Sequence, residues 1–217
     1  MLLDHRIPSC YWPDLSSWKA DVDSYGYNTR SPEFVNIRAY SKRPQAQRRN
    51  FDKHVDAYFR ADQEWHALRV KLGRPPDFKT AYNWTLRVRR VPDGNRRLTR
   101  KVLPLLGDLQ CYLLTADLMY ANEVASPDAQ TIGDVVTKLQ GKGAWHGLHQ
   151  AGQFMSAVPK NEEVVAAFCR VYTFIEERLT QEERDLIQFD PVMLEHALCK
   201  YQRLMRELKD GPGSEEF

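Results

Sequence analysis

Two pairs of residues have a spacing that could serve chemistry. His146 and His149 stand three positions apart in AWHGLHQAG, and His196 and Cys199 have the same spacing. On a helix, this spacing puts both side chains on one face. Four such groups could bind zinc, and a histidine beside a cysteine could activate a thiolate. Nothing in the sequence brings the two pairs together, so we predict no metal site, no cofactor and no catalytic residue.

The strongest chemical signal is the separation of charge. The net charge is +10 over residues 1–105 and −8 over residues 106–217. Basic side chains neutralise phosphates and release counterions, and aromatic rings such as Tyr82 and Trp84 can stack on unpaired bases. A surface for an acidic protein has the same composition. The candidate residues for a nucleic acid or an acidic partner are Arg43, Arg48, Arg49, Arg87, Arg89, Arg90, Arg96, Arg97, Arg100 and Lys101.

A second candidate surface lies in the last predicted helix, from Asp190-Pro191 to about residue 209. Its apolar residues step by 4, 3, 4 and 3, which is the spacing of a two-helix seam. Glu195 and several basic residues lie around this stripe. The stripe either docks on a partner helix or belongs to the protein's own core. Its members are Leu194, Leu198, Tyr201, Met205 and Leu208.

The element that would position these groups is the most apolar run, residues 103–125. Apolar residues fall on nearly all sides of its helical wheel, which is typical of a buried central helix. Pro104 suits the first helical turn. Asp108, Asp117 and Glu123 interrupt the run, so it is not a membrane span. We predict that the other helices pack around it.

Several helix boundaries are marked by capping residues. A helix over about 46–72 should end at Gly73. Ser126, followed by Pro127 and Asp128, should cap the next helix after the central one. Asn161 should begin another, and Thr180 has capping-box spacing to Glu183. Gly141 and Gly143 should form a tight turn between helices, with Trp145 as a core residue.

Residues 77–101 fit two interpretations. Asp77 could cap a helix that runs through Val91, which the helical character of the rest favours. YNWTLRVR, however, alternates between apolar and polar residues, and PDGN at 92–95 is typical of a turn. A small β-hairpin near 82–101 is therefore the alternative.

These patterns predict a mostly α protein of about six to eight helices in one bundle. The expected organisation is a basic N-terminal part over 1–76, a helical bundle over 77–210 and a disordered tail over 211–217. The cysteines lack metal-type spacing and no secretory signal is visible, so we expect an intracellular protein with reduced thiols.

The expected function is that of a non-catalytic interaction protein. It would bind a protein partner or itself, and its basic half would dock an acidic partner; a nucleic-acid-binding protein is the alternative. No small-molecule substrate or membrane is indicated. The charged halves also favour head-to-tail association at low salt.

Overall fold

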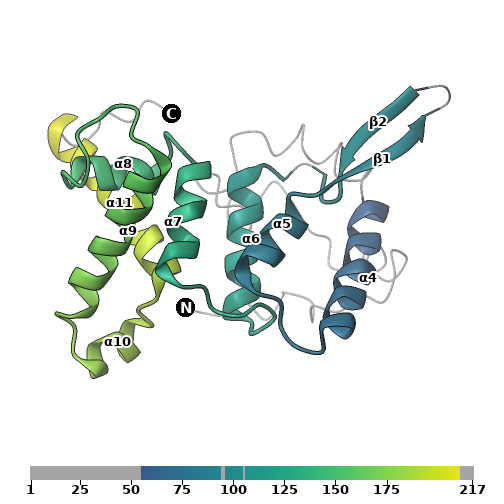
Figure 1. The fold of residues 1–217 in the computed structure, drawn as a ribbon, viewed down its shortest axis with the longest axis horizontal. Coiled ribbons are helices and arrows are strands. Elements are labelled where there is room, and N and C mark those ends of the chain that lie inside the picture. The colour runs from purple at the N-terminus through teal and green to yellow at the C-terminus, as the bar shows by residue number, and fades with distance from the viewer. Residues whose placement is uncertain (1–54, 94–95, 105, 211–217) are drawn as a thin grey trace, which may run out of the picture. The chain divides into compact units, whose positions relative to one another are not determined.

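The computed structural model describes residues 55–93, 96–104 and 106–210, and this part of the chain is mostly α-helical (Figure 1). It contains eight helices, which confirms the predicted fold class at this level. The chain divides into two compact units. The first comprises the described residues up to Arg74 together with Asn83–Cys111, and the second comprises Pro75–Tyr82 and the residues from Tyr112 on.

The first unit begins with helix α4, Val55–Leu72. The helix ends as predicted, because Gly73 has a φ of 63° and its amide donates to the carbonyls of Arg69 and Val70. Trp65 lies on the inner side of this helix and packs on Trp84, with ring centroids 5.0 Å apart. The start predicted near residue 46 lies outside the described residues.

The helix predicted from Asp77 through Val91 is wrong beyond Thr85. Helix α5 spans Phe78–Thr85, and Asp77 caps it by accepting a hydrogen bond of 2.8 Å from the Thr80 amide. Strands β1 (Val88–Asp93) and β2 (Arg96–Lys101) follow and pair antiparallel. β-branched residues and the turn-forming PDGN sequence after Thr85 outweigh the helical character of the rest of the chain.

The apolar run 103–125 is helical over a shorter length than predicted. Helix α6 spans Asp108–Tyr120. Pro104 lies before the helix, where its carbonyl accepts a hydrogen bond from the Tyr58 hydroxyl. Gly107 precedes the first turn, and its amide donates to the Gln110 side chain at 3.1 Å. Positive φ at Asn122, 60°, accompanies the end of the helix.

The rest of the second unit consists of five helices joined by short loops. Their bounds are α7 Ala129–Lys138, α8 Gly143–Gln150, α9 Asn161–Glu176, α10 Gln181–Ile187 and α11 Pro191–Asp210. The predicted beginnings of α9 and α11 and the Thr180–Glu183 capping box are confirmed. Asp128, not Ser126, caps α7, since its carboxylate accepts from the Thr131 amide at 2.7 Å.

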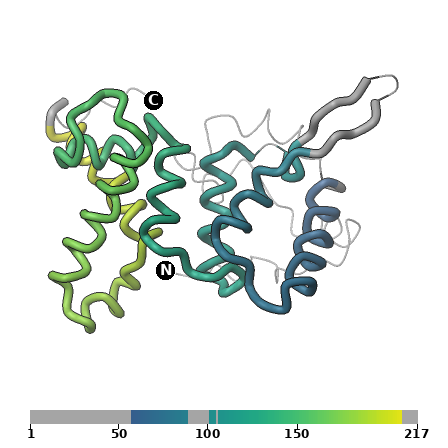
Figure 2. The backbone as a smooth tube through the Cα atoms, in the orientation of Figure 1, coloured from purple at the N-terminus to yellow at the C-terminus, as the bar shows by residue number. Residues whose placement is uncertain are grey.

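Glycines bring the helices of this unit into close contact. A Cβ on Gly147 of α8 would overlap the Leu198 carbonyl of α11, and one on Gly143 would overlap the Cys199 thiol. On the next pair of helices, a Cβ on Gly133 of α7 would lie 3.2 Å from Val165 of α9. Figure 2 follows the backbone through these helices, with α10 at one end of the unit and the last turns of α11 at the other.

Candidate acidic-partner interface

The candidate interface begins at Arg87, directly before β1. Its guanidinium donates a hydrogen bond of 2.6 Å to the Glu64 carboxylate of α4 and lies over the Trp84 ring, 5.8 Å from the centroid. Trp84 in turn rests on Trp65. Arg87 therefore joins the start of the strand to α4.

Lys101 closes the other end of the strand pair. Its ammonium group donates to the Leu106 carbonyl at 2.9 Å and lies 3.6 Å from the Asp108 carboxylate. The next amide, of Val102, donates to the Arg87 carbonyl at 2.8 Å. The two outermost basic residues of the segment 87–101 thus have acidic partners inside their own unit.

The backbone register places the remaining basic residues on both faces of the two-stranded ribbon β1–β2, which we call the basic ribbon. Because successive residues of a strand alternate between faces, residue pairs two positions apart share one face. One face has Arg89 opposite Arg100, and the other has Arg97 opposite Pro92. On the same pattern, Arg96 belongs to the first face, and Arg90 and Lys101 to the second.

The register also brings like charges together. Arg89 and Arg100 are direct cross-strand partners, and opposed like charges destabilise an antiparallel pair. Asp93, opposite Arg96, is the acidic residue of the two strands. The ribbon carries a net charge of +5 over residues 88–101.

Tyr82 is not available to stack on a base, contrary to the sequence-based expectation. It is 1% exposed and packs edge-on against Tyr112, with ring centroids 6.4 Å apart. The Lys138 ammonium covers its ring at 5.6 Å. Arg43, Arg48 and Arg49, the other predicted basic residues, lie outside the described part of the chain.

The predicted partner stripe of α11 is divided between core and surface. Leu194 and Leu198 are buried against their own unit, whereas Leu208 is 69% exposed. Tyr201 and Met205, between them, are half-buried. The first half of the stripe is therefore internal core, and the second half lies at the surface.

The histidines are packed against aromatic rings rather than gathered at one point. His149 stacks on Trp145 with an interplanar angle of 3°, and His146 meets the same ring edge-on. His196 lies edge-on to Tyr112. Within the described ranges, no three His, Cys, Asp or Glu residues are placed to hold a metal ion. Cys199 is a free thiol.

Glu195 is a buried carboxyl group that the sequence pattern placed on the rim of the α11 stripe. It is 6% exposed, and burial raises its pKa to about 7, while the nearby Tyr112 hydroxyl lowers it in part. The carboxylate lies 3.7 Å from Nε2 of His196. Burial also lowers the pKa of His196. Helical spacing gave no sign of this burial, because it depends on contacts with α6.

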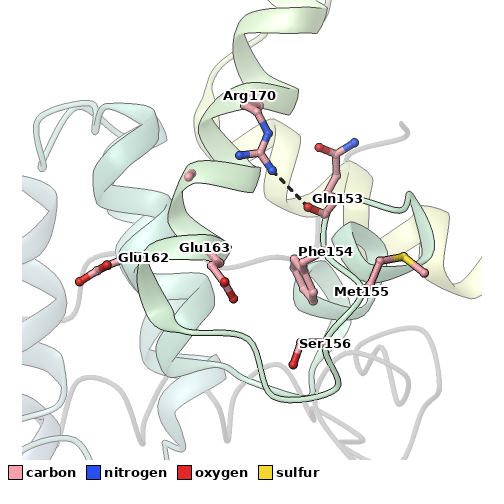
Figure 3. A pocket seen from close by; sticks show the side chains of 8 residues that line it. Gln153, Phe154, Met155, Ser156, Glu162, Glu163 and Arg170 are labelled. Carbon is pink, nitrogen blue, oxygen red and sulfur yellow. Dashed lines mark hydrogen bonds between the residues drawn. The ribbon is translucent and has the colours of Figure 1, made fainter.

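An open hollow of about 430 Å³ lies between α9 and the loop after α8 (Figure 3). Arg170 donates across it to the Gln153 carbonyl at 3.1 Å, and Glu163 accepts from the Lys160 amide at 2.9 Å. These charged groups thereby support the loop and the start of α9. The hollow is lined by Gln153, Phe154, Met155, Ser156, Glu162, Glu163, Ala166 and Arg170.

Comparison with protein-family models, curated proteins and solved structures gives no match for this chain. None of the helices in the described part combines the length and apolar character that a membrane crossing needs. Sequence reasoning missed Glu64 and Asp108 as partners of the basic segment. The Glu64 contact has no local signal, since Glu64 stands 23 positions from Arg87.

Proposed function

We propose that this protein is a non-catalytic interaction protein whose basic ribbon docks an acidic macromolecule. The observation that carries the proposal is the placement of Arg89 opposite Arg100. Two opposed arginines disfavour the free ribbon, and an anionic partner would turn this cost into attraction. Arg87 and Lys101, which have acidic partners in their own unit, would hold the ends of the ribbon in place.

The first partner class is an acidic protein segment. A labelled acidic peptide, such as a polyglutamate chain, serves as the probe in an anisotropy titration. We expect binding that weakens as salt rises from about 50 to about 200 mM, because exposed charges are screened over this range. Replacement of Arg96, Arg97 and Arg100 by glutamine should weaken binding.

A matched control removes the same charge from another surface. Lys71, Arg74 and Lys79 are exposed and lie outside the ribbon. Their replacement by glutamine lowers the net charge equally and should leave binding nearly unchanged. Equal losses from the two triple variants would mean that net charge alone attracts the peptide, and the assignment to the ribbon would be wrong.

A nucleic acid is the second candidate partner, and one observation favours it. Basic residues occupy both faces of the ribbon, whereas a flat acidic surface would meet one face. The major groove of B-DNA admits a two-stranded ribbon and has phosphates along both walls. Neither strand contains an aromatic residue for base stacking, so this proposal favours a duplex over a single strand.

Labelled duplex DNA, single-stranded DNA and RNA in the same titration distinguish the two partner classes. Tight duplex binding with a steep salt dependence supports the nucleic-acid proposal. Binding of the acidic peptide with none of the nucleic acids supports the first.

A further inference from the structure

The second unit has two ends that each carry exposed apolar residues. The charged residues around them are mainly acidic at one end and mainly basic at the other. Helix α10 forms one end, and the last turns of α11, yellow in Figure 1, form the other. Because a helix rises 1.5 Å per residue, residues 200–208 lie about 14 to 26 Å along the axis of α11 from its first residue, Pro191. The two surfaces therefore lie at different ends of the unit and do not cover one another.

The first surface, the acidic end, comprises residues 176–187. Leu186 is 82% exposed, Ile187 is 42% exposed, and α10 buries none of its residues. The segment has a net charge of −3. Arg178 and Arg184, its two basic residues, donate to the Phe174 and Glu176 carbonyls of the same unit. The charge that this end presents to a partner is therefore predominantly negative.

The second surface, the basic end, comprises residues 200–208 of α11. Leu204 is 51% exposed and Leu208 is 69% exposed. Lys200 and Arg203 are exposed beside them, and the segment has a net charge of +2. It continues the apolar stripe whose first half, at Leu194 and Leu198, already packs inside the unit. The stripe thus runs out of the core onto an open surface.

From this complementarity we infer that the acidic end of one molecule docks on the basic end of a second copy. Each surface has exposed apolar side chains, and their burial away from water is favourable. The two surfaces also have net charges of opposite sign, which attract one another. The contact joins two different surfaces, so it is head-to-tail and leaves one free surface of each kind on every pair. This inference goes beyond the proposed function, because neither of the two surfaces belongs to the basic ribbon.

Two double variants block one surface each. Leu186→Glu with Ile187→Glu changes the acidic end, and Leu204→Glu with Leu208→Glu changes the basic end. All four positions are exposed, so circular dichroism should show unchanged helix content. Sedimentation velocity of the full chain at about 50 mM salt should show concentration-dependent assembly for the unchanged protein and monomers for either variant. Assembly should weaken at about 200 mM salt.

Mixing the two variants is the decisive step. Each retains the surface that the other lacks, so one junction can form and the mixture should give a 1:1 dimer that grows no further. Met155→Glu, at a position 88% exposed elsewhere on the unit, is the matched control and should assemble like the unchanged protein. A monomeric unchanged protein at low salt would overturn the inference, as would assembly that survives both variants.

A mixture that stays monomeric, although each variant is folded, would also overturn it, because a symmetric contact would then be the better description. The polyanion titrations are independent of this result. If the unchanged protein does not self-associate but still binds a polyanion at the basic ribbon, the inference is wrong and the proposed function still holds.

Discussion

The Arg87 guanidinium donates a hydrogen bond of 2.6 Å to the Glu64 carboxylate, so the first arginine of the basic segment joins β1 to α4 within its own unit. Arg89, two positions on, is instead the cross-strand partner of Arg100. Of these two residues, Arg87 has an acidic partner in its own unit, and the backbone register places Arg89 opposite Arg100.

Replacement of Arg87 by glutamine should affect stability slightly and binding little. The pair is substantially exposed, with 46% of the Arg87 side chain accessible, and such pairs contribute about 0–1 kcal/mol. Urea unfolding should show a loss within this range, and the affinity for a polyanion should change less than about twofold. A larger loss of affinity than that of the Arg96, Arg97 and Arg100 variant would contradict this division of roles.

Removal of the ribbon arginines should flatten the salt dependence of nucleic-acid binding. Each phosphate contact contributes about 0.9 to the slope of log K against log salt on B-DNA. The variant with Arg96, Arg97 and Arg100 changed to glutamine should lose up to about 2.7 of that slope. The variant should bind duplexes of all sequences more weakly and to the same extent, which competition between unrelated duplexes measures. An unchanged slope would exclude these residues as phosphate contacts.

Folding stability should fall as pH rises through the range set by Glu195. Its pKa lies near 4.5 in the unfolded chain and at about 7 in the folded one. Below about 4.5 the carboxyl is protonated in both states. Between these two pKa values the unfolded chain releases its proton while the folded chain keeps it. The unfolded state is therefore stabilised relative to the folded state, and the free energy of unfolding falls. The loss is complete above about pH 7 and is on the order of 3 kcal/mol.

The variant Glu195→Gln should remove this dependence and be more stable than the unchanged protein at pH 8. Glu207→Gln, an exposed position on the same helix, is the control and should keep it. Burial lowers the pKa of His196, so the Glu195→Gln variant should show a residual loss of stability toward acid. Identical pH profiles of urea unfolding for this variant and the unchanged protein would show that Glu195 is not the source.

Replacement of Gly147 by alanine should destabilise the second unit. The new Cβ would overlap the Leu198 backbone carbonyl, so α8 and α11 would have to separate. Overpacking of this kind costs about 1–3 kcal/mol and lowers the melting temperature by roughly 2–12 °C in a chain of this size. Gly143→Ala would overlap both the thiol and the Cβ of Cys199; only the thiol can rotate away, so this variant should also lower the melting temperature. Equal melting temperatures for Gly147→Ala and the unchanged protein would contradict this packing.

Local capping signals predicted the helix boundaries well. Gly73 and the Thr180–Glu183 capping box mark their helix ends as expected, because these contacts lie within a few residues of one another. The shift of the α7 cap from Ser126 to Asp128 is small for the same reason. Local chemistry therefore specifies the end of α4 and the beginnings of α7 and α10.

Contacts distant in the chain could not be predicted. The sequence pattern placed Glu195 beside the apolar stripe of α11. In the structure it is buried beside Tyr112, which stands 83 positions earlier in the chain. The apolar run 103–125 suggested one long helix, yet Gly107 and Asn122 flank a shorter one. The packing of all helices around this run and the domain boundary expected at residue 76 stay predictions.

The most direct test of the account is an anisotropy titration of the full chain with labelled duplex DNA and a labelled acidic peptide, from about 50 to about 200 mM salt. We expect at least one of these polyanions to bind and the binding to weaken steeply with salt. Replacement of Arg96, Arg97 and Arg100 should reduce the binding, and replacement of Lys71, Arg74 and Lys79 should not. No binding of either at low salt, or equal losses from the two triple variants, would contradict it.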